Sequence, residues 1–230
     1  MDNRVQGLHH LAISTADIKT QIDFFTDKLG MELVALYWMH GAKETWHGFL
    51  RMNDESAVAF VQGPLVASIP QKFGETHAGN PTAASAAGTT QHIALKVKGM
   101  EDLLRMQARL RSRGVPVLGP VDHGFCKSIY FAGPEGLALE LSCSDAPIAP
   151  DSWIDPDVVA RAGISPEELE RYRNPPVYEP SAQEVSQPGP DAPGPHMTNY
   201  PPGIYEKLIA LSDQQVWDAS ESAPPVGGAR

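Results

Sequence analysis

The chain has 230 residues, of which 42% are hydrophobic and 20% are charged, a composition typical of a globular protein. Its 18 lysines and arginines stand against 28 aspartates and glutamates, which gives a formal net charge of -10. This charge disfavours nucleic acids and anionic membrane surfaces, because both are themselves negative. We therefore expect no nucleic-acid partner and no membrane partner.

Targeting and membrane-spanning segments are not expected either. Residues 1–7 contain no apolar run behind a basic segment, and no apolar stretch approaches the roughly 20 residues that cross a bilayer. The two cysteines, Cys126 and Cys143, are too few for a disulfide framework, although a single bridge between them stays open. A reducing compartment, and hence a cytoplasmic location, is expected.

Residues 7–143 contain one unit that occurs twice. The stretches His10–Ile13 and His92–Leu95 open the two copies, and in each a histidine precedes an apolar residue, an alanine and another apolar residue. Both stretches are predicted to be buried strands. Each is followed by a helical pattern, over residues 17–30 and 100–114, with apolar residues recurring on one face.

Capping residues and apolar faces define both predicted helices. Asp17 is placed to cap the first helix, while Gly30 and Gly114 stand where the two helices should end. The apolar residues expected to face the core are Ile18, Ile22, Phe25 and Leu29 in the first copy, and Met100, Leu103, Leu104 and Leu110 in the second.

Three strand-like runs follow each helix. The predicted strands are residues 31–38, 46–52, 57–62, 115–118, 127–132 and 137–143. The sequence therefore predicts an α+β fold of two βαβββ modules, residues 7–62 and 90–143, within a domain of residues 1–145. The Gly-, Ala-, Ser-, Thr- and Pro-rich connector between them, residues 63–89, is expected to be a long loop.

Residues 146–230 form a Pro-rich C-terminal extension in which the strand periodicity fades. Short helices are predicted over 157–162, 165–173 and 205–217. The extension contains more tyrosine and tryptophan than disordered segments usually have. We expect it to pack along its own domain or along a partner subunit.

One hairpin can be predicted in detail. Residues 133–137 should form its loop, because Pro134 suits the second position of a type I turn and Gly136 the left-handed position after it. Counting outward from the paired ends of this loop places Tyr130 directly across from Glu140. The two side chains should share one sheet face, with their Cβ atoms about 5 Å apart.

A metal site is predicted from two histidines and one glutamate. The leucines at alternate positions of 137–141 mark the core-facing side of their strand, so Glu140 points to the other side. A carboxylate in so apolar a strand is costly unless it is paired or bound to metal. His10 and His92 occupy matching places in the two modules and should converge if the modules pack about a pseudo-two-fold axis. Two imidazoles and a carboxylate form the ligand set of a non-haem Fe(II) or similar divalent site.

A purely structural role for these histidines stays open, because a buried histidine is more often a hydrogen-bonded core residue than a ligand. His9 should face the other side of its strand and is expected to be structural. Cys126 and Cys143 are expected to be small core or pocket residues rather than ligands.

The paired modules, their histidine-led strands and the Tyr-x-x-x-Pro-x-Gly-x-x-x-Glu hairpin over residues 130–140 resemble the vicinal oxygen chelate superfamily. This superfamily contains glyoxalase I, fosfomycin and bleomycin resistance proteins, and type I extradiol dioxygenases. The resemblance covers residues 7–143 and implies that each module curls into a half-barrel around a metal. It carries metal-binding roles onto His10, His92 and Glu140.

Residues 121–140 are similar to the extradiol ring-cleavage signature, and the resemblance gives His123 and Tyr130 the roles of its second-sphere histidine and tyrosine. At Gly133 that signature prefers an acidic or small polar residue. Under this reading Tyr130 would hydrogen-bond a substrate oxygen, and His123 would move or stabilise a proton.

The chain departs from its relatives at two further places. The fourth ligand of glyoxalase I falls within residues 58–61, where no ligand is available. Extradiol enzymes usually have a histidine pair, one member of which is the acid-base catalyst, where this chain has Ser56 and Ala57. His47 or His40, from a neighbouring strand, is the candidate to approach the metal instead.

The resemblance implies a metal-dependent enzyme, foremost an Fe(II) extradiol-like dioxygenase acting on a catechol-like or other aromatic small molecule, with Mn(II) and Zn(II) as alternative metals. A non-redox isomerase, epimerase or lyase and a resistance-type binding protein are the alternative functions. Because folds of this kind commonly dimerise, a homodimer is expected. Arg51 or Lys127 is the candidate partner for a substrate carboxylate.

Overall fold

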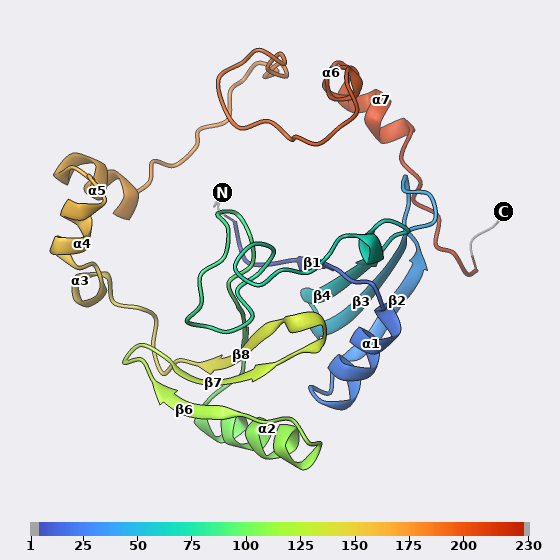
Figure 1. Cartoon of the computed structure of the whole chain (residues 1–230). Coiled ribbons are helices and arrows are strands. Elements are labelled where there is room, and N and C mark those ends of the chain that lie inside the picture. The colour runs from blue at the N-terminus through green and yellow to red at the C-terminus, as the bar shows by residue number, and fades with distance from the viewer. Residues whose placement is uncertain (1–4, 228–230) are drawn as a thin grey trace. The chain divides into compact units, whose positions relative to one another are not determined.

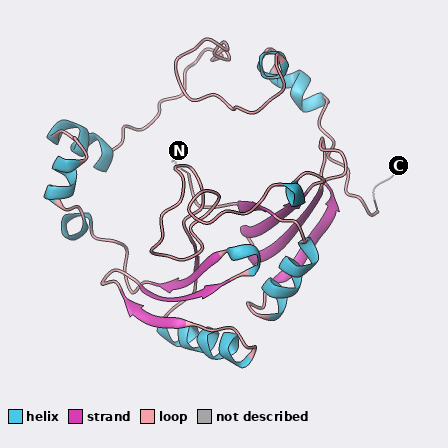
Figure 2. Cartoon of the chain, viewed as in Figure 1, coloured by secondary structure: helices cyan, strands magenta, loops and turns pink. Residues whose placement is uncertain are grey.

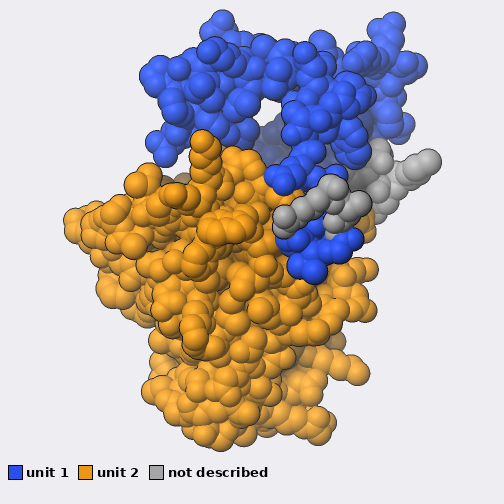
Figure 3. Space-filling model, turned by 90° about the vertical axis from the view of Figure 1, so that its right-hand side faces the viewer, with its two compact units in different colours: residues 1–5, 166–230 blue, residues 6–165 orange. Residues whose placement is uncertain are grey.

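The computed structural model describes residues 5–227, which divide into two compact units (Figure 3). The larger unit spans residues 6–165 and contains all eight described strands. The other unit gathers Val5 with residues 166–227. Within residues 5–227, no helix has both the length and the apolar character that crossing a membrane requires.

The larger unit contains two four-stranded mixed sheets that remain separate and do not close into a barrel (Figures 1 and 2). Their strand orders are β1-β4-β3-β2 and β5-β8-β7-β6. The outer pairs β1/β4 and β5/β8 are parallel, and the other neighbours are antiparallel. The predicted α+β fold of repeated βαβββ modules is confirmed. The strands are β1 (His10–Ser14), β2 (Glu32–Trp38), β3 (Trp46–Asn53), β4 (Ser56–Gln62), β5 (Ile93–Lys96), β6 (Leu118–Asp122), β7 (Lys127–Ala132) and β8 (Ala138–Cys143).

One long helix packs on one face of each sheet, α1 (Ile18–Asp27) on the first and α2 (Met100–Ser112) on the second. As predicted, Asp17 caps α1, since its side chain accepts a hydrogen bond from the backbone N–H of Thr20. Gly30 follows α1 with a φ of 75°, a left-handed conformation that glycine adopts without steric cost.

The helices and the sheet faces beneath them form one hydrophobic core. Most of the predicted apolar faces are part of it, but Leu104 is 44% exposed, because its neighbour Leu103 occupies the core-facing position one step around the helix. The buried core residues are Ile18, Phe25, Leu29, Leu50, Val58, Phe60, Leu103, Leu110, Ile129, Phe131, Leu137, Leu139, Leu141 and Cys143.

The prediction of a strand over 115–118 is wrong. β6 begins at Leu118, and Val115 and Val117 instead pack against the core without strand pairing. Their apolar alternation therefore reflects burial of the loop between α2 and β6 rather than a strand. The observed strand contains a register shift at its Gly-Pro pair, where proline offers no N–H to the ladder.

The connector over 63–89 is mostly loop, as expected, with one short 3-10 helix, η1 (Val66–Ser68). It is nevertheless anchored to the rest of the unit, because His77 forms backbone bridges with Phe73 and Thr90 and is itself buried.

The extension contains five short helices in the described residues: α3 (Pro150–Trp153), α4 (Pro156–Arg161), α5 (Pro166–Arg173), α6 (Ile204–Ile209) and α7 (Asp213–Asp218). The first two lie in the larger unit. The prediction of one helix over 205–217 is wrong, because Ser212 and Gln215 form a capping box that starts a new helix. Sequence reasoning also missed α3.

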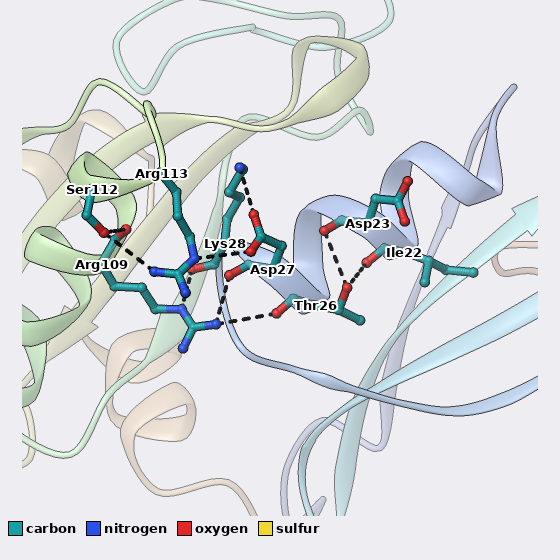
Figure 4. A network of polar contacts seen from close by, with 8 residues as sticks. All are labelled: Ile22, Asp23, Thr26, Asp27, Lys28, Arg109, Ser112 and Arg113. Carbon is teal, nitrogen blue, oxygen red and sulfur yellow. Dashed lines mark hydrogen bonds and ion pairs between the residues drawn. The ribbon is translucent and has the colours of Figure 1, made fainter.

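The two modules contact each other through their helix-covered sides. Arg109 on α2 donates hydrogen bonds to the backbone carbonyls of Lys28 (2.9 Å) and Asp27 (2.8 Å) at the end of α1 (Figure 4). On the hairpin before β8, Glu135 accepts hydrogen bonds from the backbone N–H of Ala16 and the side chain of Gln21, both at 2.7 Å. These contacts leave the other face of each sheet without a covering helix.

Candidate functional site

The face of the second sheet opposite α2 forms one wall of a cavity of about 790 Å³. Strand alternation directs every second side chain of β5, β7 and β8 to this face. The remaining wall comes from the loop before β7 and from the chain after β8. The lining residues are His92, Ala94, Lys96, His123, Phe125, Cys126, Tyr130, Glu140, Ser142, Ser144, Asp145, Ala146, Pro147 and Ile148.

Glu140 lies at the base of this cavity and is only 4% exposed. Its Oε2 atom lies 3.0 Å from Nε2 of His92, and its Oε1 atom accepts a hydrogen bond from the hydroxyl of Ser142. Ser142 in turn lies 2.7 Å, Oγ to Oγ, from the fully buried Ser128. A buried carboxylate is therefore held in one orientation by a histidine and a serine pair.

His92 is held between Gln91 and Glu140. Its Nδ1 atom is hydrogen-bonded to Oε1 of Gln91, whose amide nitrogen faces the backbone oxygens of Asn80 and Ala83. The other ring nitrogen, Nε2, therefore faces Oε2 of Glu140 inside the cavity.

Tyr130 and His123 form a second polar pair in the same cavity. Tyr130 lies directly across from Glu140, as the hairpin predicted, and its hydroxyl is 2.8 Å from Nε2 of His123. Burial, followed by the negative charge of Glu140, raises the pKa of Tyr130 above its ordinary value. The phenol therefore keeps its proton at neutral pH and can donate a hydrogen bond.

The loop that carries His123 is fixed by the start of the extension. The ring of Phe125 packs edge-on against Trp153 with centroids 4.8 Å apart. A Cβ atom at Gly124 would lie 2.8 Å from the Trp153 ring, so only glycine fits there without displacing that side chain. The sequence led us to expect the extension to pack through its aromatic residues, but it did not indicate that residues 144–148 line the cavity.

The uncovered face of the first sheet holds the other predicted histidines. His10 lies with its ring centroid 5.5 Å from that of Phe49 and 6.4 Å from that of His47. His47 is buried, and its Nε2 atom has no hydrogen-bond partner. Burial, followed by the charge of His10, lowers the pKa of His47, so this imidazole is neutral at pH 7. Tyr37 stacks on Phe49 beside it.

Strand register shows that the two uncovered faces are equivalent but chemically different. Ala59 occupies in the first module the position that Glu140 occupies in the second, and Phe49 occupies that of Tyr130. The first module therefore offers an imidazole, His10, without a neighbouring carboxylate.

The structure thus brings together His92 with Glu140 and His123 with Tyr130, while His10 and His47 lie on the other module. Within residues 5–227, no three His, Cys, Asp or Glu side chains are grouped so that they could hold a metal ion. The convergence of His10 with His92 stays a prediction, and so does the ligand set of His10, His92 and Glu140.

A family model described as the Glyoxalase/Bleomycin resistance protein/Dioxygenase superfamily matches residues 7–141. The chain belongs to this superfamily. The match spans both modules and most of the cavity residues, including β5, β7 and the first four residues of β8. The superfamily contains many enzymes and also proteins that bind ligands without catalysis.

Three solved structures of low sequence identity are among those similar to this chain. A glyoxylase/bleomycin resistance protein/dioxygenase domain from Frankia sp. EAN1pec is 13% identical, covers 61% of this chain and 99% of its own, and has a TM-score of 0.48. The antibiotic binding protein TnmS3 from Streptomyces sp. CB03234 is 18% identical, with 61% and 98% coverage and a TM-score of 0.44. An integron cassette protein from the Halifax Harbour sewage outfall metagenome is 23% identical, with 60% and 99% coverage and a TM-score of 0.44. No curated protein matches the chain significantly.

Members of the glyoxalase/bleomycin resistance/dioxygenase superfamily often bind divalent metals, and the donor set of this member fits such an ion in part. Nε2 of His92 and Oε2 of Glu140 lie 3.0 Å apart in the cavity, and an imidazole and a carboxylate are both ligand types that divalent metals accept.

Other predictions about single residues are also resolved. Cys126 and Cys143 are both free thiols, which closes the alternative of a disulfide, and Cys143 is buried while Cys126 lines the cavity. The two candidate partners for a substrate carboxylate are already used, since Arg51 pairs with Glu32 and Lys127 pairs with Asp145.

Proposed function

We propose that this chain is a metal-dependent enzyme of the vicinal oxygen chelate type, and specifically an Fe(II) extradiol-like dioxygenase acting on a catechol-like or other aromatic substrate. Mn(II) and Zn(II) are the alternative metals. The observation that carries the proposal is the approach of Nε2 of His92 to Oε2 of Glu140, beside the Tyr130–His123 pair in one cavity.

We further propose that two copies of the chain complete the site as a homodimer. The second module contributes an imidazole and a carboxylate, His92 and Glu140, whereas the first contributes an imidazole alone, His10. A two-fold arrangement would place the first module of one chain over the second module of the other. The third ligand would then be His10 of the partner subunit, and each dimer would contain two identical sites.

In this site Fe(II) would supply Lewis acidity toward two neighbouring substrate oxygens and the electrons for dioxygen chemistry. The residues of the chain have separate tasks. Ser142 fixes the orientation of Glu140. Tyr130, protonated at neutral pH, donates a hydrogen bond to a substrate oxygen, and His123, 2.8 Å from its hydroxyl, takes up or returns a proton. His47, neutral and unpartnered, would enter the site with His10 as a general base.

The second candidate is a non-redox isomerase, epimerase or lyase, and one observation favours it. Ser56 and Ala57 lie at the start of β4, where extradiol relatives carry their acid-base histidine. With no imidazole at that place, proton transfer falls to His47 or His123, which also suits chemistry through an enolate. A resistance-type binding protein is the remaining alternative.

Oxygen uptake separates these functions. The protein, purified anaerobically and loaded with Fe(II), Zn(II) or Mg(II), is mixed with catechol in an oxygen-electrode cell, with His92→Ala as the control. Oxygen uptake with Fe(II) alone, abolished in the variant, is the expected result. Substrate conversion without oxygen would favour the isomerase or lyase, and recovery of unchanged, tightly bound ligand would favour the binding protein.

A further inference from the structure

Lys96 is an exposed residue that lines the cavity on the same strand face as His92. It is the last residue of β5 and pairs in register with Ser142, two residue pairs beyond Ala94 and Glu140. His92, Ala94 and Lys96 alternate along the strand, so all three line the cavity. At a rise of roughly 3.3 Å per residue, the Cα atoms of His92 and Lys96 are about 13 Å apart.

The charges of the cavity are matched except at Lys96. Of its two carboxylates, Glu140 faces His92 and Ser142, and Asp145 is bound 2.7 Å from the ammonium group of Lys127. Lys96 is the one lysine or arginine among the described lining residues, and it forms no ion pair with any described carboxylate. The cavity therefore presents an unmatched cation at Lys96.

Apolar side chains line the same cavity as the His92–Glu140 pair and Lys96. Phe125, Pro147 and Ile148 line it together with Ala94, whose small side chain leaves room above the strand. A flat apolar group fits such walls, and the edge-on contact of Phe125 with Trp153 holds that wall in place.

We propose that Lys96 binds the anionic group of the substrate, so that the cavity selects aromatic acids: two adjacent oxygens at His92 and Glu140, a ring between the apolar walls, and a carboxylate at Lys96. This rests on the proposed function, because it assigns the oxygen pair to the same cavity. It also supplies the local attraction that an anionic substrate needs on a protein of net charge -10.

The test compares an acid with its neutral isostere. Binding of 3,4-dihydroxybenzoate and of 3,4-dihydroxybenzamide to the Zn(II)-loaded full chain is measured by calorimetry under argon, for the unaltered protein, Lys96→Gln and Lys98→Gln. Lys98 is exposed and is not among the residues that line the cavity. Lys98→Gln therefore makes the same change of charge and side chain as Lys96→Gln, but outside the cavity, and serves as its control. An exposed lysine–carboxylate pair should favour the acid about fivefold.

We expect this preference in the unaltered protein and in Lys98→Gln, and its loss in Lys96→Gln with binding of the amide unchanged. Equal weakening of both ligands in Lys96→Gln, a preference that survives this substitution, or binding of neither ligand to the unaltered protein would overturn the proposal. A Lys96-dependent preference without oxygen uptake would leave the acid subsite standing and remove the dioxygenase. Oxygen uptake without a preference for the acid would leave the dioxygenase standing and remove the acid subsite.

Discussion

Replacement of Glu135 by alanine should weaken the contact between the two modules. The Glu135 carboxylate accepts two hydrogen bonds of 2.7 Å from the first module, one from the backbone N–H of Ala16 and one from Nε2 of Gln21. Gln21 is 0% exposed, so its amide would be left buried without that acceptor. An unsatisfied buried donor costs about 1–3 kcal/mol, and a hydrogen bond to a charged group contributes about 1.5–3 kcal/mol.

Allowing for the half-buried position of Glu135 and for water reaching Ala16, Glu135→Ala should lower the free energy of unfolding by about 2–4 kcal/mol. Glu135→Gln keeps one acceptor oxygen and should cost about half as much. Urea unfolding followed by circular dichroism measures both changes.

Glu44 provides a matched control for the backbone conformation. Like Glu135 (φ 53°), it is a non-glycine residue with positive φ (51°), but it is exposed. Glu44→Ala should therefore change stability by less than about 0.5 kcal/mol. If Glu135→Ala were as mild as Glu44→Ala, the carboxylate would not hold the modules together and this reasoning would be refuted.

Three further predictions concern single side chains. Gly136→Ala should destabilise the fold by more than about 2 kcal/mol in urea unfolding, because its φ is 72° and a Cβ would lie 2.6 Å from Nε2 of His77; an unchanged midpoint would contradict the packing described. Ser142→Ala should weaken Zn(II) binding about tenfold, measured by calorimetry, because Oε1 of Glu140 loses its hydrogen bond. Ser142→Thr keeps the hydroxyl and should bind Zn(II) as the unaltered protein does. Equal Zn(II) affinity of Ser142→Ala and the unaltered protein would exclude an orienting role for Ser142. Because the pKa of His47 is lowered in the folded state, unfolding takes up a proton as pH falls through the ordinary value of 6.5. The unaltered protein should therefore lose more stability than His47→Gln between pH 7 and pH 5, and parallel losses would show that His47 does not contribute.

Local chemistry explains which parts of the fold the sequence predicts. The ends of the loop over 133–137 pair as predicted, and pairing outward from them fixes Tyr130 across from Glu140 without any long-range information. The predicted type I turn is wrong, because Glu135 (φ 53°) is left-handed as well as Gly136. The same local logic fails at 205–217, where apolar spacing continues through a residue, Ser212, that starts a new helix.

Long-range contacts explain why the assembled site could not be predicted. Whether His10 meets His92 depends on how the modules pack, and this is determined by contacts such as Glu135 with Ala16, which lie 119 residues apart in the sequence. No local pattern encodes such a pairing. Lys96, in contrast, shares the alternation of His92 along β5, so its place in the cavity had a sequence signal that was overlooked.

Metal analysis of mixed dimers tests most directly whether the site is shared between two chains. His10→Ala and His92→Ala chains with different affinity tags are co-expressed, dimers containing both are isolated, and their Zn(II) content is compared with that of each variant alone. The mixed dimer contains one interface with every proposed ligand intact and one with two ligands missing. We therefore predict one bound metal per mixed dimer, two per unaltered dimer, and none for either variant alone. Mixed dimers without metal, or full metal content in either variant alone, would contradict a site built from His92 and Glu140 of one chain and His10 of the partner subunit.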